Sequence, residues 1–167
     1  MNTDAKKTVL RMIPYGIYVL TAADGKGGIA AATVNFVTQT SFAPPLVALG
    51  VKADSGAYAA VKAGGRFALN MLGKAGKGSA FTFFRPADVA DGKLSGHPYR
   101  LGANGAPILE AAIGAVECTV TTIVAEGDHH IVIGEVTEAH LPAAPAGRPD
   151  AAILEMKDLG ETVFYGG

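Results

Sequence analysis

The sequence predicts a mainly β protein, an antiparallel β-barrel with short helices. Several runs rich in β-branched and aromatic residues follow one another along the chain, and turn residues separate them. The 22 glycines and the low content of charged residues, 17%, fit a chain with many turns. Helical and strand-like runs do not alternate as they would in a parallel Rossmann-type sheet. The antiparallel barrel is therefore the predicted fold class.

The composition narrows the class of protein further. With 167 residues, of which 49% are apolar, the chain is long enough to bury its own core, and we expect one domain over residues 1–167. A net charge of −1 does not provide the basic surface that nucleic-acid binding requires. The sequence has no run of about 18 apolar residues and no signal-peptide pattern behind Lys6 and Lys7. We therefore expect a cytoplasmic protein that binds neither nucleic acid nor membranes.

The first half of the chain carries most of the predicted strands. A polar lead-in over residues 1–12, with one or two helical turns, precedes them. Apolar and β-branched runs then alternate with turns, and one run is apolar throughout, as in a strand that is covered on both faces. The predicted strands cover residues 15–22, 29–40, 46–51 and 66–72.

Two short helices are predicted among and after these strands. Ser55 stands where an N-cap residue would, and residues 56–62 have helical composition. A second helix within residues 74–84 would carry Phe81 and Phe84 inward. Both helices are too short to form a layer of their own, which agrees with a barrel.

The second half of the chain begins with a long polar excursion over residues 85–107, and loops of that length are often functional. A hairpin follows. Two β-rich runs, residues 115–125 and 131–140, flank Gly127 and Asp128, which predict a two-residue turn. This hairpin is the clearest local prediction in the chain.

The C-terminal part contains one more predicted strand, over residues 152–156. The tail that includes it, residues 150–167, carries Phe164 and Tyr165, which a free tail would not need. We expect the tail to dock on the barrel or on a partner subunit.

A search for catalytic and metal-binding motifs finds no complete one. Residues 76–79 contain glycines and a lysine, but the spacing of a phosphate-binding loop is absent, and neither GxGxxG nor GxSxG occurs. His129 and His130 follow Asp128, but adjacent residues of a strand point to opposite faces, so they cannot both bind one ion. Cys118 is the sole cysteine. We expect no metal site, because catalytic zinc needs three convergent ligands.

Residues 31–55 are the best candidate for a binding site. A strand with hydroxyl and amide side chains leads to Pro44 and Pro45, and Lys52 and Ser55 follow. A helix N-terminus beside a lysine suits a phosphate group, although a capping serine and a surface lysine explain the same residues. The polar strand also has two interpretations: a row of contacts to a cofactor, or an ordinary exposed strand. His129 is either a solvated turn residue or a donor above a ligand.

Two features are specific in combination: the corner from Ser41 to Pro45 and the Gly127-Asp128-His129 hairpin. With the segments around them, they resemble the flavin reductase-like family of FMN-binding split β-barrels. The resemblance runs in order from residue 15 to residue 136. Its matching segments are residues 33–35, 39–47, 52–55, 67–72, 105–112, 117–118 and 127–136.

The resemblance implies an antiparallel FMN-binding split barrel that forms a homodimer, with FMN, or less often FAD, bound near the dimer interface. It implies hydride transfer from NADH or NADPH to the flavin. Reduced flavin would then pass to a partner monooxygenase or to another electron acceptor. Two alternatives stay open: an electron-carrier flavoprotein without a dedicated nicotinamide site, and a relative of pyridoxamine phosphate oxidase-like barrels with another substrate.

The same resemblance assigns roles to nine residues. The flavin ring and its ribityl chain would contact residues of the polar strand, the phosphate would bind at the helix N-terminus, and a histidine would lie on the nicotinamide side. In that order these residues are Thr33, Val34, Asn35, Gln39, Thr40 and Ser41, then Lys52 and Ser55, then His129. The flavin supplies the hydride chemistry itself, which is why no separate catalytic motif is needed.

Overall fold

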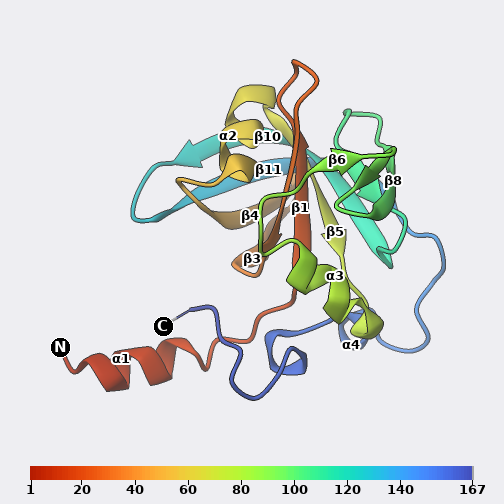
Figure 1. The fold of residues 1–167 in the computed structure, drawn as a ribbon. Helices are drawn as coiled ribbons and strands as arrows, with labels where there is room; N and C mark the ends of the chain where they lie inside the picture. Colours follow the sequence, from red (N-terminus) through yellow and green to blue (C-terminus); the bar gives the residue numbers. More distant parts are fainter. Residues whose placement is uncertain (167) are drawn as a thin grey trace.

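The computed structural model describes residues 1–166, and its largest element is a seven-stranded antiparallel sheet. The strands are β1 (Tyr18–Ala23), β2 (Ile29–Val34), β3 (Val37–Phe42), β4 (Pro45–Lys52), β5 (Arg66–Met71), β10 (Gly114–Val124) and β11 (His129–His140). Their order in the sheet is β2-β1-β5-β10-β11-β4-β3. The two outer strands, β2 and β3, follow each other in the sequence, so the sheet curls round on itself (Figure 1). The predicted mainly β antiparallel barrel is thus confirmed.

The sequence predicts one long strand over residues 29–40, and this prediction is wrong. The chain pairs with β1 up to Val34 and then joins β4 from Val37 onward. Between these two pairings the carbonyl of Phe36 accepts a hydrogen bond of 2.8 Å from the backbone N–H of Gly50. The Phe36 side chain also packs against Gly50. A Cβ added to Gly50 would lie 3.1 Å from the Cβ of Phe36. The strand breaks because the chain must pass from one edge of the barrel to the other.

The helix after β4 forms where the sequence predicts it. In α2 (Gly56–Gly64) the Ser55 hydroxyl accepts a hydrogen bond of 3.1 Å from the Tyr58 N–H, as an N-cap does. Gly65 ends the helix with φ of 64°, a left-handed conformation that glycine adopts without strain. The part of the chain that the structure describes has no helix long and apolar enough to cross a bilayer. Near the two ends of the chain lie the helices α1 (Thr3–Leu10) and α4 (Pro149–Ala152) and the 3₁₀ turn η2 (Met156–Asp158).

The second predicted helix is present as η1 (Lys74–Gly76) and α3 (Lys77–Thr82), but a different phenylalanine points inward. Phe81 and Phe84 are 40% and 48% exposed, whereas Phe83 is 1% exposed. Phe83 is the residue that directly follows the helix, so its direction is set by the exit of the chain and not by the helical repeat. The prediction that Phe81 and Phe84 face the core is therefore wrong.

The excursion over residues 85–107 is not a plain loop. Most of it folds, with the residues just after it, into a small antiparallel sheet that Leu94 anchors in the core. Its strands are too short for a side-chain alternation to be visible in the sequence. They are β6 (Val89–Ala90), β7 (Lys93–Leu94), β8 (His97–Leu101) and β9 (Pro107–Leu109).

The predicted hairpin exists, but its turn is longer than the two residues 127–128. The last pair between β10 and β11 is Val124 with Ile131. His129 lies opposite Lys52 of the neighbouring strand β4 instead. This register brings the start of β11 beside the end of β4, and thereby places two candidate site residues next to each other.

The C-terminal tail (residues 150–166) packs under the barrel, and its predicted strand over residues 152–156 is wrong. Helix α4 is followed by two isolated bridges. Leu154, which is fully buried, donates a hydrogen bond to the carbonyl of Leu72 and accepts one from the N–H of Ile17, both of 2.7 Å. The expectation that the tail docks extends to Gly167, which lies outside the described residues.

At the end of β11 a carboxylate is buried against a histidine. Glu117 accepts hydrogen bonds from Nε2 of His140 at 2.7 Å and from the backbone N–H groups of Ala103 at 3.0 Å and Asn104 at 2.6 Å. Arg100 donates to the other ring nitrogen of His140 at 2.9 Å. Burial alone would raise the pKa of Glu117, but these donors more than offset burial and hold the pKa below its usual value. This cluster joins the small sheet to the barrel.

Candidate functional site

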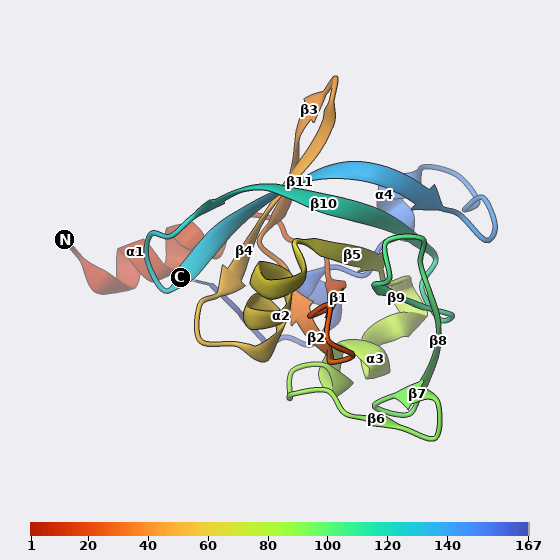
Figure 2. The same cartoon turned by 90° about the horizontal axis from the view of Figure 1, so that it is seen from above.

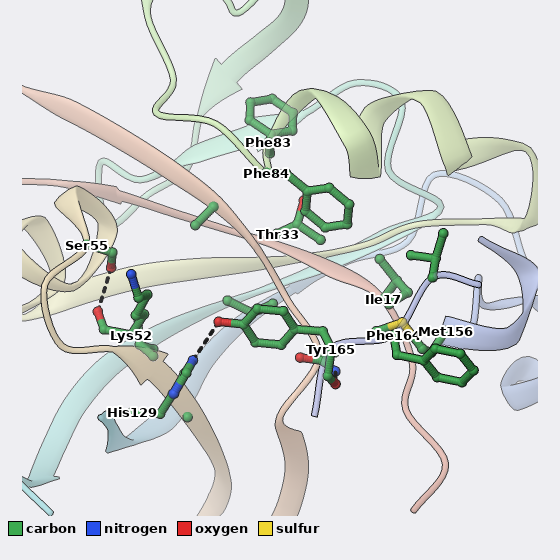
Figure 3. Close-up of a pocket in the computed structure, with 16 residues that line it drawn as sticks. Ile17, Thr33, Lys52, Ser55, Phe83, Phe84, His129, Met156, Phe164 and Tyr165 are labelled. Atoms are coloured by element: carbon green, nitrogen blue, oxygen red, sulfur yellow. Dashed lines mark hydrogen bonds between the residues drawn. The ribbon is translucent and has the colours of Figure 1, made fainter. Parts of the chain in front are cut away.

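A cavity of about 280 Å³ opens where β2, β4 and the start of β11 meet α3 and the C-terminal tail (Figure 3). Its two ends differ in chemistry. Polar side chains lie at the end formed by β4 and β11, and apolar side chains line the opposite end. The apolar lining comes from Ile17, Phe83, Phe84, Met156, Val163 and Phe164.

Lys52 and Ser55 form the polar end of the cavity. Lys52 is the last residue of β4, and its ammonium group lies 3.1 Å from a carboxylate oxygen of Asp54. The ammonium donates a hydrogen bond of 3.3 Å to the other carboxylate oxygen, and this bond and the charge of Asp54 raise the pKa of Lys52, so the ammonium stays protonated. The Ser55 hydroxyl donates to the Lys52 carbonyl at 2.7 Å and caps α2, whose first N–H groups carry a partial positive charge. One full charge and one helix N-terminus thus meet at this end.

Strand β2 and the residue after it, Asn35, form a side wall of the cavity, but the polar side chains of this wall are bonded to protein. The hydroxyl of Thr33 donates to the carbonyl of Ala80 at 2.7 Å, which attaches α3 to the sheet. Asn35 is 3% exposed, and its side-chain Nδ2 donates to the carbonyl of Tyr165 at 3.0 Å. Thr33, Val34 and Asn35 all line the cavity. The side chains of Thr33 and Asn35 hold the elements that enclose it.

His129 lies at the polar end, next to Lys52 in the strand register. Its Nδ1 is 2.9 Å from a carboxylate oxygen of Asp128, and its Nε2 is 2.8 Å from the hydroxyl of Tyr165 (Figure 3). The bond from His129, and then its charge, hold the pKa of Asp128 below its usual value. Phe36 lies edge-on to the imidazole, with ring centroids 5.3 Å apart. The ring is therefore contacted at both nitrogens and on one side.

Gln39, Thr40 and Ser41 are not brought into this cavity within the described part of a single chain. They lie on the β3–β4 arm (residues 37–46), which projects from the barrel in Figure 2. The side chains of Gln39 and Thr40 bond within the arm: Gln39 donates to the carbonyl of Ser41 at 3.1 Å, and Thr40 to that of Leu46 at 3.5 Å. Phe42, near the tip, is 90% exposed. Sequence reasoning placed these residues on the straight extension of β2, and the break at residues 35–36 removes them from that line.

The C-terminal tail is the part of the site that sequence reasoning missed. Val163, Phe164 and Tyr165 all line the cavity. The two aromatic residues indicated that the tail docks, but nothing in a single sequence shows where a segment that distant in the chain will lie.

The site contains no metal cluster. Within residues 1–166 no three His, Cys, Asp or Glu side chains gather as an ion would require. The arrangement suits an elongated organic ligand instead, with an anionic group at Lys52 and α2 and an apolar part toward α3 and the tail.

Comparisons with known proteins identify the family of the chain. The flavin reductase like domain family matches residues 10–156. The chain is 34% identical to a flavin reductase of Pseudomonas putida over 148 residues, which cover 89% of this chain and 82% of that protein. It is 30% identical over 143 residues to the flavin-dependent monooxygenase reductase subunit HsaB of Mycobacterium tuberculosis, with 86% and 73% covered.

A solved structure with the same fold is the NADH:FAD oxidoreductase SgcE6 of Streptomyces globisporus, in complex with NAD and FAD fragments. It matches with a TM-score of 0.68 and 30% identity, over 78% of each chain. Some relatives are longer, and the chain spans 38% and 53% of two proteins from Rhizobium meliloti. The split barrel, its cavity and these relatives lead to one conclusion: the chain belongs to the flavin reductase-like domain family.

Proposed function

We propose that the chain is an NAD(P)H-dependent FMN reductase, in which a nicotinamide reduces a flavin held in the cavity beside β2 and β4. The observation that carries this proposal is the register of β4 and β11. It places Lys52, a cation at a helix N-terminus, directly opposite His129. In this proposal one cavity would hold the flavin phosphate at Lys52 and the nicotinamide beside the imidazole of His129.

The residues present fit a phosphorylated flavin. Lys52 and the N–H groups at the start of α2 would hold the phosphate, because both favour an anion. Strand β2 would supply the side wall, and Phe84 with Met156 would exclude water from the apolar end. A bound flavin would supply the hydride-accepting chemistry. The chain's own contribution is to bind, to orient and to keep water out.

We propose that the bound flavin is FMN rather than FAD, and that the electron donor is NADH or NADPH. The polar end offers one lysine and one helix N-terminus, which suits a single phosphate group. The complex of SgcE6 with NAD and FAD fragments supports a nicotinamide donor but favours the larger flavin for that relative. The balance between FMN and FAD therefore depends on binding measurements.

We also propose that the chain acts as a homodimer in the cytoplasm. The β3–β4 arm carries Gln39, Thr40 and Ser41 away from the cavity of its own chain and exposes Phe42 (Figure 2). Helix α1, among the described residues, buries no side chain of its own. A second copy that covered the arm and α1 would bury these groups and could bring the arm residues to a flavin.

A partner that consumes reduced flavin is supported by one of the relatives. HsaB is the reductase subunit of a flavin-dependent monooxygenase. We propose that this chain supplies reduced flavin to a monooxygenase in the same way.

One observation favours the second candidate, an FMN-binding electron carrier. Tyr165 lines the cavity and bonds to Nε2 of His129, a contact that would limit the space for a nicotinamide beside the ring. In a carrier this arrangement would persist when flavin is bound.

Two measurements separate these proposals. Fluorescence titration with FMN, FAD and riboflavin tests the phosphate site, because riboflavin lacks the phosphate and should bind more weakly than FMN. Oxidation of NADH or NADPH in the presence of FMN tests the reductase. A carrier would bind FMN without oxidising either nicotinamide, and a protein that binds no flavin would contradict both proposals.

A further inference from the structure

Tyr165 is held from several sides, through both its backbone and its ring. Its carbonyl accepts the hydrogen bond from buried Asn35, at 3.0 Å, and its hydroxyl lies 2.8 Å from Nε2 of His129. The ring centroid is 5.8 Å from that of Phe36 and 5.7 Å from that of His129. The neighbouring tail residue, Phe164, is also held: the guanidinium carbon of Arg11 lies 4.4 Å from the centroid of its ring. Through Tyr165, Asn35 on one side of the cavity is thus linked to His129 on the other.

The direction of the bond to His129 follows from the groups around the ring. A carboxylate accepts hydrogen bonds, so the Nδ1 that faces Asp128 carries the proton in the neutral ring. Nε2 is then the acceptor, and the hydroxyl of Tyr165 donates to it. Burial is the main cause that raises the pKa of Tyr165, so the hydroxyl keeps its proton for this bond.

Asp128 alone is a weak support for the imidazole. Its side chain is 94% exposed, and an exposed ion pair fixes a geometry poorly. The His129 side chain, in contrast, is 18% exposed and lies against the cavity. A second attachment at Nε2 therefore decides how the ring faces the cavity.

We propose that Tyr165 is a positioning residue: its hydroxyl fixes the His129 imidazole toward the nicotinamide side of the cavity, and Asn35 holds Tyr165 in place. This inference rests on the proposed reductase function for its kinetic consequence, but the contact itself does not. Asn35 thereby acts through the tail and not through its own contact to the flavin.

The chain contains a matched control for this contact. Nδ1 of His130 lies 2.7 Å from the hydroxyl of Tyr58, which is the same pair of groups one residue along the chain. Tyr58 is 7% exposed and does not line the cavity. Tyr58→Phe therefore removes a phenol–imidazole bond without touching the site.

The contact is tested by ¹⁵N NMR of the histidine rings. With Tyr165→Phe, the Nε2 resonance of His129 should move toward the position of a free acceptor, while the Nδ1–H tautomer that Asp128 fixes stays. Tyr58→Phe should shift His130 and leave His129 unchanged. An unchanged Nε2 resonance of His129 in Tyr165→Phe would overturn the proposal.

The kinetic role is tested by a double-mutant cycle. Tyr165→Phe should lower kcat/KM for the nicotinamide about fivefold to tenfold, the loss of roughly one hydrogen bond, and leave the flavin Kd unchanged. In a His129→Ala background the same change should have no further effect, and Tyr58→Phe should match the wild type. An equal loss in both backgrounds would overturn the proposal. If the wild type binds flavin but oxidises no nicotinamide, the proposed function fails, and the ¹⁵N result still decides whether Tyr165 positions the ring.

Discussion

The two ends of strand β11 carry the same pair of groups in opposite surroundings. His129 begins the strand beside the carboxylate of Asp128, and His140 ends it beside Glu117. The side chain of Asp128 is 94% exposed, whereas that of Glu117 is 1% exposed. Glu117 is surrounded by donors of the protein, whereas Asp128 stands in solvent beside His129.

The difference lies in the carboxylates, because the two histidine side chains are similarly exposed, at 18% and 19%. At the closed end, backbone N–H groups from residues 103–104 and the ring of His140 complete the hydrogen bonds of Glu117, so the cluster serves to join two sheets. At the open end, the ring of His129 is held by an exposed carboxylate and by the tail. Histidine–carboxylate pairs are thus a weak guide to function until burial and the neighbouring space are known.

The largest expected effect is on stability, from Glu117→Ala. This change removes the buried acceptor of the N–H groups of Ala103 and Asn104 and of the ring of His140. We expect a loss of about 3 kcal/mol in the free energy of unfolding, as for the breaking of a buried pair. Urea denaturation measures it, with Asp128→Ala as the matched change at the open end. Equal losses in both variants would contradict the distinction between the two ends.

The next largest effect is on flavin binding, from Lys52→Ala. Loss of a cation that bonds the phosphate should raise the Kd for FMN roughly tenfold to a hundredfold, the range for hydrogen bonds to charged groups. Riboflavin, which has no phosphate, should bind both proteins equally. Lys62→Ala, at the other end of α2, is the control for a lost surface charge. An unchanged Kd for FMN would place the phosphate elsewhere.

A smaller effect is the dependence of stability on acid. The pKa of Glu117 is lower in the folded protein than in the unfolded chain, so its contribution is fully present above the unfolded value, about 4.3. That contribution is lost as the pH falls through the folded value. The free energy of unfolding should therefore decrease below about pH 4.3, and Glu117→Gln should flatten part of this decrease. A wild type and variant with parallel acid profiles would contradict the assignment.

The smallest effect concerns Cys118, which follows Glu117 at the closed end. Burial, and then the charge of Glu117, raise the pKa of this thiol to about 12. The thiolate is the reactive form, so the native protein should not react with a thiol reagent at neutral pH. Labelling should appear only after denaturation. Rapid labelling of the native protein would show that the barrel core around Cys118 opens.

Local features of the sequence predicted part of this structure well. The cap at Ser55, the helix behind it and the long hairpin all depend on residues near one another, and the structure has them. The break at residues 35–36 and the inward direction of Phe83 depend on how the chain crosses the barrel, which no local pattern records. The candidate site divides in the same way. Lys52, Ser55 and His129 meet because two strands pair, whereas the arm residues of β3 and the wall contributed by Tyr165 are set by long-range packing.

The most direct test of hydride transfer beside His129 is a single-turnover measurement. Flavin-loaded protein is mixed anaerobically with NADH or NADPH, and the absorbance of the oxidised flavin is followed. The wild type should lose this absorbance, and His129→Ala should do so about tenfold more slowly with an unchanged flavin Kd, as expected when one hydrogen-bonding group is lost. A wild type whose flavin stays oxidised with both nicotinamides, or a His129→Ala protein as fast as the wild type, would contradict this prediction.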